Sequence, residues 1–367
     1  MKRKFIISGG GTGGHIFPAI AIANKLKQLI PDAEILFIGA NGKMEMKRVP
    51  EAGYPIEGLD IYGISRDFSP RGIARNLKLP FVLMNSMSKA KRIIRNFKPD
   101  VVIGVGGFAS GPALRAAAAL GIPTLIQEQN SFPGVTNKLL AKTVSKICVA
   151  YPGLEHYFPE EKIVLTGNPV RDIILNLKDK SPEAYQFFGL SPEKRTILVV
   201  GGSLGARTIN ECLASGIDDL AQTGTQLIWQ TGELFYNTIS QDLLDKQSET
   251  IKIMPFIREM DKAYEVADII ISRAGAIAIS ELTIVGKPTI LVPFPYAAED
   301  HQTKNAQALV DRNAAILISD HDATEKLLPS LYELINNPKQ CNTLSQNIKK
   351  LAQPEAIDKI AEEILKL

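Results

Sequence analysis

The sequence predicts an α/β protein built from two Rossmann-like halves. Short apolar runs alternate with amphipathic stretches along the whole chain, which is typical of βαβ units around parallel sheets. The segment TILVVGGSLGAR at 196–207 repeats the strand and glycine turn of KFIISGGGTGGH at 4–15. Likewise, ADIIISRAGAIAISELTIVGKPTILVP at 267–293 echoes PDVVIGVGGFASGPALRAAAALGIPTLIQ at 99–127. With 367 residues, 45% of them hydrophobic, the chain is long enough for two domains.

Apolar runs predict six strands in each half, with helices between most of them. They lie at 4–8, 34–38, 100–105, 124–127, 146–150, 162–166, 196–200, 226–230, 250–254, 268–272, 289–292 and 314–318. The join is expected near TGNPVRD at 166–172, where Gly-Asn-Pro interrupts the pattern. We therefore expect domains at 1–166 and 167–352. A last helix at 353–367 has an apolar stripe and is expected to pack back on the first domain.

Cysteine usage and charge restrict the location and the partners. Cys148, Cys212 and Cys341 lie far apart, without a CxxC pair or a secretory leader, so we expect free thiols in a reducing cytoplasm. No apolar run approaches the roughly 18 residues needed to cross a bilayer. Residues 1–165 carry 22 Lys and Arg against 12 Asp and Glu, whereas the rest carry 20 against 27. This asymmetry indicates that the first half meets an anionic partner, whether lipid headgroups, phosphates or nucleic acid.

Four glycine-rich turns follow expected strands and are the candidate binding loops. They lie at 9–14, 104–111, 201–207 and 273–281. Glycine permits positive φ and close approach of a ligand to the backbone, and the first amides of a following helix favour an anion. A cleft between the halves, facing the carboxyl ends of both sheets, is the expected ligand site.

Two common nucleotide-binding motifs fit these turns poorly. GGGTGG at 9–14 matches the dinucleotide fingerprint, which also needs an acid at the end of the second strand. Glu34 opens that strand, and its end at 38–41 has no carboxylate, which disfavours an NAD-dependent oxidoreductase. No GK[ST] follows any turn, which excludes a P-loop. Glu281, six residues past Gly275, is better placed to accept the ribose hydroxyls of a nucleotide whose phosphates sit on the helix end.

Together these stretches resemble the MurG family of peptidoglycan glycosyltransferases. The segments that carry the resemblance are GGGTGGHIFPAIAIA, GVGGFASGPA, QEQNSFPGVTNK, TGNPVR, GGSLGAR, RAGAIAISEL, PTILVPFP and DHQTKNA. They cover nearly the whole chain. The resemblance implies the two-domain GT-B fold, with parallel sheets facing a central cleft, and no metal or other cofactor. It also implies inverting transfer of N-acetylglucosamine (GlcNAc) from UDP-GlcNAc to the C4 hydroxyl of MurNAc in lipid I, giving lipid II.

The resemblance also implies a set of donor-binding residues. They are Thr12, Gly13, Gly14, Asn130, Arg171, Ser203, Ile257, Ala276, Ile277, Ala278, Ile279, Ser280, Glu281 and Gln302. Ser203 would bond the diphosphate, Glu281 the ribose, and the backbone near Ile257 the uracil. Gln302 suits sugar hydroxyls because its amide is both donor and acceptor. Leu204 departs from the family pattern, since many relatives have Gln there and leucine cannot hydrogen-bond.

Glycosyl transfer to a hydroxyl needs a base, and two residues are candidates. His15 ends the first glycine turn, at a helix start that disfavours the charged imidazolium. It is the candidate general base, although turn histidines often only bond backbone or phosphate. Glu128 is the second candidate, and the alternative is that it anchors its loop. His156 and His321 are expected to be ordinary surface residues.

The stretch SDHDA at 319–323 contains an Asp-x-Asp pair. Metal-dependent glycosyltransferases use this motif to hold Mn²⁺ on the donor diphosphate. Here it precedes a helix-forming run, where Asp is a favoured N-cap. Helix capping is the preferred interpretation, and no metal is expected.

A membrane-docking patch is expected within 71–98, because lipid I is anchored in a bilayer. The helix expected past Pro80 has its core stripe at Leu83, Met87, Ala90, Ile94 and Phe97, which leaves Phe81 exposed. The patch combines apolar and basic residues suited to anionic lipid: Ile73, Leu77, Leu79, Phe81, Arg71, Arg75 and Lys78. The alternative is a loop packed on its own domain. Gly104, Gly106 and Gly107 are expected to cradle the lipid diphosphate.

The expected partners are UDP-GlcNAc, lipid I, the anionic cytoplasmic leaflet and other cell-wall synthesis proteins, without nucleic acid. The expected location is the cytoplasmic face of the plasma membrane, as a peripheral protein. A non-hydrolysing UDP-GlcNAc 2-epimerase or another GT-B transferase is the alternative enzyme. A nucleotide-sugar sensor is the alternative without catalysis.

Overall fold

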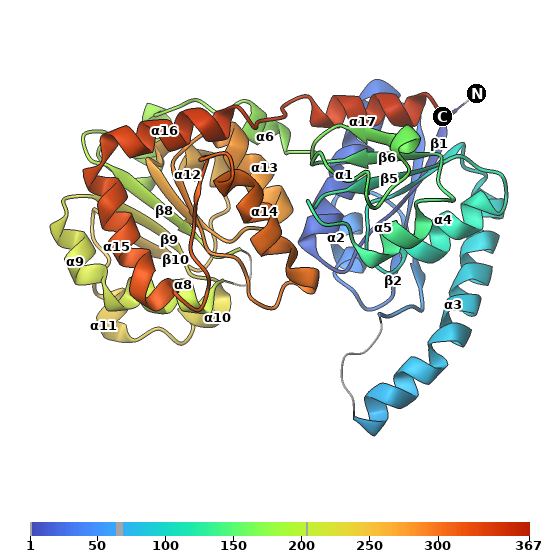
Figure 1. Cartoon of the computed structure of the whole chain (residues 1–367), viewed down its shortest axis with the longest axis horizontal. Helices are drawn as coiled ribbons and strands as arrows, with labels where there is room; N and C mark the ends of the chain where they lie inside the picture. Colours follow the sequence, from blue (N-terminus) through green and yellow to red (C-terminus); the bar gives the residue numbers. More distant parts are fainter. Residues whose placement is uncertain (1, 64–68, 203–204) are drawn as a thin grey trace. The chain divides into compact units, whose positions relative to one another are not determined.

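The chain forms two compact α/β units. The computed structural model describes residues 2–63, 69–202 and 205–367, except for the side chains of residues 70–75 and 298. The first unit comprises Met1–Val170 and Glu355–Leu367, and the second comprises Arg171–Pro354. Each unit has its own parallel sheet with helices packed on it (Figure 1).

The first unit contains a seven-stranded sheet in the order β3-β2-β1-β4-β5-β6-β7. All neighbouring strands pair in parallel. The strands are β1 (Lys4–Ser8), β2 (Glu34–Ala40), β3 (Ile56–Leu59), β4 (Val101–Gly104), β5 (Thr124–Glu128), β6 (Lys146–Val149) and β7 (Ile163–Leu165). The strand order reverses between β1 and β4, as in Rossmann folds.

The second unit repeats this arrangement with six parallel strands in the order β10-β9-β8-β11-β12-β13. The strands are β8 (Thr196–Val200), β9 (Gln226–Gln230), β10 (Ile251–Met254), β11 (Ile269–Ser272), β12 (Thr289–Leu291) and β13 (Ile316–Leu317). Here the order reverses between β8 and β11. The two sheets confirm the parallel α/β class predicted from the sequence.

Helices connect successive strands in both units. In the first unit they are α1 (Gly13–Leu29), α2 (Glu45–Glu51), α3 (Pro70–Phe97), α4 (Ser110–Ala118), α5 (Val135–Leu140), the 3₁₀ turn η1 (Glu160–Lys162) and α17 (Ala356–Leu365). In the second unit they are α6 (Asp172–Leu175), α7 (Pro182–Phe188), α8 (Arg207–Ser215), α9 (Ile217–Gln222), α10 (Glu233–Tyr236), α11 (Gln241–Leu244), α12 (Met260–Val266), α13 (Ala276–Val285), η2 (Ala298–Asp300), α14 (His301–Val310), α15 (Ala323–Asn336) and α16 (Pro338–Lys349). No helix in the described part of the chain combines the length and the apolarity needed to cross a membrane.

Both faces of the first sheet are buried. Phe5 and Ile7 of β1 enter one apolar cluster and Ile6 enters the other, because side chains alternate along a strand. The last helix, α17, buries Ile360 and Ile364 in the same cluster as Phe5 and Ile7. Figure 1 shows α17 lying over α1.

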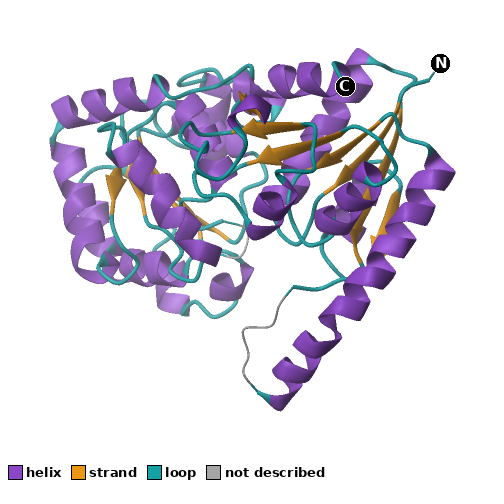
Figure 2. Cartoon of the chain, turned by 45° about the vertical axis from the view of Figure 1, so that its right-hand side comes forward, coloured by secondary structure: helices purple, strands orange, loops and turns teal. Residues whose placement is uncertain are grey.

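The structure corrects three details of the prediction. All twelve expected strands are present, but β3 was not expected. Helix α3 begins at Pro70 rather than after Pro80, and it projects from the first unit as one long helix (Figure 2). Pro80 lies inside this helix and is exposed, although proline has no N–H to donate to a helical carbonyl. Leu83, expected in the core stripe, is 39% exposed, whereas Ala90 and Ile94 are fully buried.

The three cysteines are free, as expected. Cys148 of β6 is fully buried in the same apolar cluster as Phe5 and Ile7. Burial raises the pKa of its thiol to about 12, so the group stays protonated at neutral pH.

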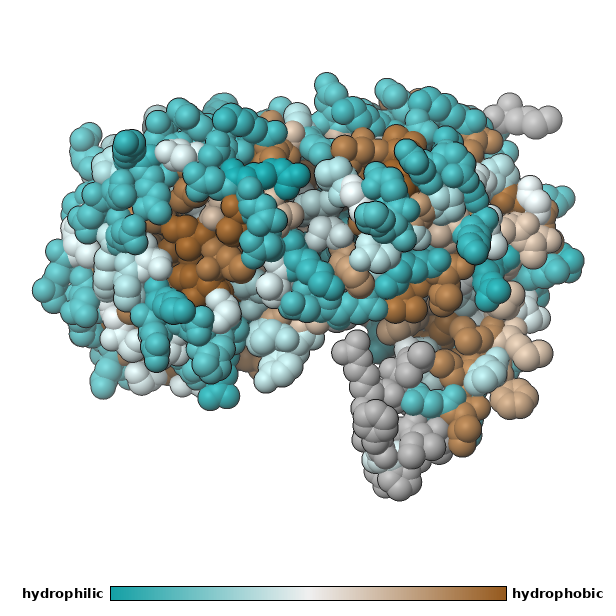
Figure 3. Space-filling view, in the orientation of Figure 1, coloured by the Kyte–Doolittle hydropathy of each residue, from teal (hydrophilic) through white to brown (hydrophobic). Residues whose placement is uncertain are grey.

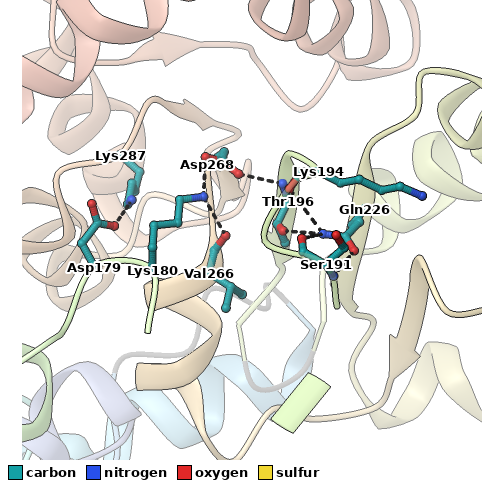
Figure 4. A network of polar contacts seen from close by, with 9 residues as sticks. All are labelled: Asp179, Lys180, Ser191, Lys194, Thr196, Gln226, Val266, Asp268 and Lys287. Atoms are coloured by element: carbon teal, nitrogen blue, oxygen red, sulfur yellow. Dashed lines mark hydrogen bonds and ion pairs between the residues drawn. The ribbon is translucent and has the colours of Figure 1, made fainter. Parts of the chain in front are cut away.

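A polar network closes the amino ends of the strands in the second unit (Figure 4). Asp268, just before β11, accepts hydrogen bonds from Lys180 Nζ at 2.6 Å and from Thr196 N at 2.8 Å. Gln226 at the start of β9 donates to Ser191 O at 2.8 Å and to Thr196 Oγ1 at 3.2 Å. Each of these polar groups thus has a hydrogen-bond partner at the same end of the sheet.

Candidate functional site

The four glycine turns lie where the strand order of each sheet reverses. The turns at 9–14 and 104–111 follow β1 and β4, which are paired neighbours. The turns at 201–207 and 273–281 follow β8 and β11, which are also paired neighbours. Ligands of open α/β sheets bind at the carboxyl ends of the strands at such switch points. The topology therefore supports one candidate binding site in each unit, at the carboxyl ends of the central strands.

In the first unit, the two turns pack directly against each other. Gly106 and Gly107 have φ of +93° and +87°, which glycine adopts readily. A Cβ at Gly106 would lie 2.7 Å from the ring of His15, and one at Gly107 would lie 2.4 Å from Gly10 O. Contact between the turns therefore accounts for these two glycines without a ligand. The proposed binding of a lipid diphosphate at Gly104, Gly106 and Gly107 stays a prediction.

His15 lies in the first turn of α1, partly buried against the second glycine turn. Its Nδ1 lies 3.0 Å from Gly10 O. Because a carbonyl can only accept, Nδ1 must carry the hydrogen, which leaves Nε2 as the acceptor in the neutral ring. This is the protonation pattern that a general base at Nε2 requires.

Glu128, the second candidate base, is buried and serves its own loop. Its Oε1 accepts from the backbone N of Asn130 at 3.0 Å and from Asn130 Nδ2 at 3.2 Å. Its Oε2 accepts from Gly134 N at 3.0 Å and from Asn137 Nδ2 at 2.8 Å. These four bonds agree with the alternative interpretation, in which Glu128 anchors the loop that carries Asn130.

Glu45 is a buried acid of the first unit that sequence reasoning missed. It starts α2 and is only 1% exposed. Its Oε2 accepts from Gly11 N at 2.8 Å, and its Oε1 accepts from Ala40 N at 3.0 Å. The dinucleotide fingerprint places an acid near here to hold a ribose. Glu45 instead lies beneath the glycine turn with both oxygens bonded to backbone, so it is not presented to a ribose.

In the second unit, the turn before α13 is open. Gly275 is the N-cap of α13, with φ −65° and ψ 143°, and a Cβ there would meet nothing within 4 Å. Neither backbone strain nor packing within the chain calls for glycine at this position. The missing side chain leaves room for a ligand beside the first amides of α13, from Ala276 onward.

Glu281 of α13 is paired with another residue of the expected donor site. Glu281 is 6% exposed, and its carboxylate accepts from Arg171 Nε at 2.8 Å and from Tyr264 Oη at 3.3 Å. Burial and the Glu281 charge raise the pKa of Tyr264 well above its usual value, which keeps the phenol a donor. Partial burial opposes the charge on Arg171, but Glu281 outweighs it and raises the pKa of the guanidinium. The structure thus brings together Arg171 and Glu281, which are 110 residues apart.

Gln230, at the end of β9, is a second residue that sequence reasoning missed. Its Nε2 donates to Gly202 O at 3.0 Å, and its Oε1 accepts from Ile257 N at 2.9 Å. It therefore links the third glycine turn to the loop expected to contact uracil. Ser203 and Leu204, at the tip of that turn, lie outside the described residues.

Other expected site residues have structural partners. Gln302 Oε1 accepts from Phe294 N at 2.9 Å. Asp320 of the Asp-x-Asp pair accepts from Arg273 Nη1 and, at 2.8 Å, from Thr208 Oγ1. In the described part of the chain, no group of three His, Cys, Asp or Glu side chains could hold a metal ion.

The capping interpretation of SDHDA is only half right. Asp322 is the N-cap residue of α15, but its side chain makes no capping hydrogen bond. It pairs instead with Lys326, at 3.0 Å, one helical turn further on. His321 beside it is exposed, as is His156, in line with their expected surface roles.

Helix α3 carries the exposed part of the expected membrane patch. Phe81 is 71% exposed and Leu77 is 72% exposed, and the neighbouring Met84 is 69% exposed. Lys78 is also exposed, whereas Leu79 is half-buried. Figure 3 shows hydrophobic surface along this helix, at the lower right. The side chains of Arg71, Ile73 and Arg75 lie outside the described residues.

Family models match both units. Residues 5–149 match the glycosyltransferase family 28 N-terminal domain, and residues 196–360 match the glycosyltransferase family 28 C-terminal domain. Two parallel-sheet α/β units with these matches define a glycosyltransferase of the GT-B class.

Individual relatives narrow this class. The chain is 54% identical over 366 residues to a protein of Parabacteroides distasonis, covering 100% of this chain and 98% of the relative. That relative is named UDP-N-acetylglucosamine–N-acetylmuramyl-(pentapeptide) pyrophosphoryl-undecaprenol N-acetylglucosamine transferase. A Porphyromonas gingivalis protein of the same name is 52% identical and covers 100% of this chain and 96% of the relative.

Solved structures agree with these sequence comparisons. The crystal structure of Acinetobacter baumannii MurG is 32% identical, with a TM-score of 0.80 and full coverage of both chains. The chain therefore belongs to the MurG family within glycosyltransferase family 28. A UDP-GlcNAc 2-epimerase from Neisseria meningitidis bound to UDP-GlcNAc has a TM-score of 0.68 at 16% identity, again over both full chains, and it shows the fold alone. The family and the GT-B class predicted from the sequence are confirmed.

Proposed function

We propose that this enzyme moves GlcNAc from UDP-GlcNAc to the C4 hydroxyl of MurNAc in lipid I, with inversion, giving lipid II for peptidoglycan synthesis. The observation that carries the proposal is the 54% identity, over the full chain, to a transferase named for this reaction. The open glycine turn at Gly275, at the switch point of the second sheet, supports it physically.

The donor is assigned to the second unit. The diphosphate lies on the first amides of α13, where the helix dipole favours negative charge. Glu281 accepts the ribose hydroxyls, while Arg171 and Tyr264 hold its carboxylate in place. The remaining expected donor contacts stay predictions: Thr12, Gly13, Gly14, Asn130, Ser203, Ile257 and Gln302.

His15 is assigned as the general base. Its Nδ1–H is bonded to Gly10 O, so Nε2 accepts the proton of the acceptor hydroxyl as the new bond forms. Glu128 is the weaker candidate because its two oxygens already accept four hydrogen bonds from its loop. A His15→Ala variant that binds UDP-GlcNAc normally but transfers at the wild-type rate would refute this role.

The acceptor is carried by a membrane, and α3 is assigned as the docking element. Leu77 and Phe81 are exposed beside basic residues, an arrangement suited to the anionic cytoplasmic leaflet. Phe81→Asp together with Leu77→Asp should reduce co-sedimentation with anionic vesicles. Leu139→Asp is the matched control, because Leu139 is 75% exposed elsewhere on the same unit. Equal loss in both proteins, or no loss in either, would refute the assignment.

The decisive assay supplies radiolabelled UDP-GlcNAc with a lipid I analogue. We expect labelled disaccharide-lipid only when both substrates are present. Incubation with UDP-GlcNAc alone is the control, because a 2-epimerase would convert it to UDP-ManNAc without an acceptor. Formation of UDP-ManNAc and no labelled lipid would overturn the proposed function.

A further inference from the structure

Glu45 and His15 are joined through a single peptide group. The N–H of Gly11 donates to Glu45 Oε2 at 2.8 Å. The C=O of Gly10, the other end of the same peptide, lies 3.0 Å from His15 Nδ1. A buried carboxylate, one peptide and the candidate base thus form a continuous chain of hydrogen bonds.

The chain is built for this close approach. A Cβ at Gly10 would lie 2.1 Å from Glu45 Oε1, and a Cβ at Gly39 would lie 2.6 Å from Glu45 Cγ. The second oxygen of Glu45 is held by Ala40 N at 3.0 Å, so the carboxylate cannot rotate away without losing that bond. Gly106 lies against the other side of the imidazole, since a Cβ there would be 2.8 Å from His15 Nε2. The ring and the carboxylate are therefore both fixed in position.

A hydrogen bond to an anion polarises the peptide that donates it. When the Gly11 N–H donates to the carboxylate, electron density in the Gly10–Gly11 peptide shifts toward Gly10 O. Gly10 O becomes a stronger acceptor, because hydrogen bonds in a chain reinforce one another. A stronger acceptor holds the hydrogen on Nδ1 and stabilises the positive ring that forms when Nε2 takes a proton. Serine hydrolases obtain this effect from a carboxylate bonded directly to the histidine.

We propose that Glu45 is the positioning residue for His15, acting through the Gly10–Gly11 peptide to hold the ring with its hydrogen on Nδ1. The proposal rests on the proposed role of His15 as the base. In the reaction, the acceptor oxygen bonds to C1 of the sugar, the bond from C1 to UDP breaks, and the hydroxyl proton passes to His15 Nε2. The Nδ1–H stays bonded to Gly10 O throughout.

A double-mutant cycle tests the proposal. Glu45→Gln keeps the size of the side chain, but it removes the charge and offers one acceptor oxygen to two amides. We expect kcat to fall about tenfold, which is a fraction of what general-base catalysis contributes. The KM for UDP-GlcNAc should stay within about twofold of the wild-type value. In the His15→Ala background, the same substitution should change kcat less than about twofold. An equal factor in both backgrounds would overturn the proposal.

The matched control is Glu51→Gln. Glu51 ends the same helix, α2, but is exposed and pairs with Arg48 at 3.0 Å. Its loss should leave kcat unchanged. If it lowered kcat as much as Glu45→Gln does, damage to α2 would explain both results and the proposal would fail.

The wild-type enzyme offers a test that does not depend on kinetics. The chain has four histidines, so nitrogen NMR of histidine-labelled protein can be assigned with His15→Gln. We expect neutral His15 to carry its hydrogen on Nδ1. A neutral ring protonated on Nε2 would overturn the proposal whatever the kinetics show.

The two proposals can fail separately. If His15→Ala transferred at the wild-type rate, the base assignment would fall, while the tautomer would still test the hydrogen-bond chain. If His15→Ala were impaired but Glu45→Gln acted equally in both backgrounds, only the role of Glu45 would fall.

Discussion

The two ends of the second sheet are arranged in opposite ways. At the amino ends, Asp268 pairs with Lys180 and accepts from Thr196 N, while Gln226 donates to Ser191 O, as Figure 4 shows. At the carboxyl ends, Gly275 faces open space at the start of α13. The polar groups at the amino ends of the strands stabilise the fold, whereas the carboxyl ends keep backbone amides accessible.

This difference shows which polar residues to expect in binding. A charge at the amino ends is satisfied by its neighbours, so its loss should affect unfolding. At the carboxyl ends, Glu281, which pairs with Arg171, lies on the helix that begins at the open turn, in a switch-point position where ligands bind. Substitutions at the amino ends should therefore reduce stability, and substitutions at the carboxyl ends should reduce catalysis.

The largest effect on catalysis is expected for Glu281→Gln. The substitution removes a charged acceptor for the ribose and weakens the hold on Arg171. Hydrogen bonds to charged groups contribute about 1.5–3 kcal/mol, so kcat/KM for UDP-GlcNAc should fall about 100-fold. Steady-state kinetics measures this, with thermal unfolding to check the fold. A wild-type KM for the donor would contradict the role of Glu281.

Asp268→Ala should instead reduce stability. It leaves Lys180 Nζ and Thr196 N without their shared acceptor, which should cost about 1–2 kcal/mol of the free energy of unfolding. We expect kcat/KM to stay at the wild-type value. Chemical denaturation of both proteins is the measurement, and a fall in kcat/KM without loss of stability would break the comparison.

The matched control for Asp268 is Asp179→Ala. Asp179 is 69% exposed and pairs with Lys287 in the same region. The Asp179 carboxylate is exposed to water, although the Lys287 side chain is only 14% exposed. The change should therefore be smaller than for Asp268→Ala, under about 1 kcal/mol.

The pH dependence of the Asp268 variant has a defined sign. Burial lowers the pKa of Lys180 and the bond to Asp268 raises it, and the net shift is upward. The stabilisation by this pair is therefore fully present below the ordinary lysine pKa and is lost as pH rises through the raised value. The difference in the free energy of unfolding between the wild type and Asp268→Ala should become smaller only in strongly alkaline solution.

Gly275→Ala should weaken donor binding less than Glu281→Gln lowers catalysis. The backbone there has φ −65° and the added methyl group meets no protein atom within 4 Å, so stability should change little. The methyl group would enter the space assigned to the donor, and we expect UDP to bind about tenfold more weakly, or about 1.4 kcal/mol. Calorimetric titration with UDP measures this change.

Gly205→Ala is the contrasting variant. At Gly205, φ is +80° and a Cβ would lie 2.1 Å from Thr231 O. This substitution should destabilise the fold itself. If both glycine variants bound UDP as tightly as the wild type, the open turn would not be the donor site.

Much of the fold could be predicted from the sequence, because buried parallel strands are continuous apolar runs. Strand β3 was missed since it has four residues, includes Glu57 and Gly58, and lies at the sheet edge. An edge strand needs less apolar sequence than a central one.

The candidate site was predicted less completely. Gly275 and Glu281 follow from a local glycine turn and its helix. Glu45 and Gln230 were missed because their roles depend on backbone groups distant in sequence: Gly11 lies 34 residues from Glu45, and Ile257 lies 27 residues from Gln230. A buried acid that bonds only to backbone leaves no periodic pattern.

The most direct test is a crystal structure of the enzyme with UDP. We expect the nucleotide at the carboxyl ends of the second sheet, with the diphosphate on the first amides of α13 and the ribose hydroxyls within hydrogen-bond distance of Glu281. UDP bound at the amino ends of that sheet, or on the first unit alone, would contradict the account.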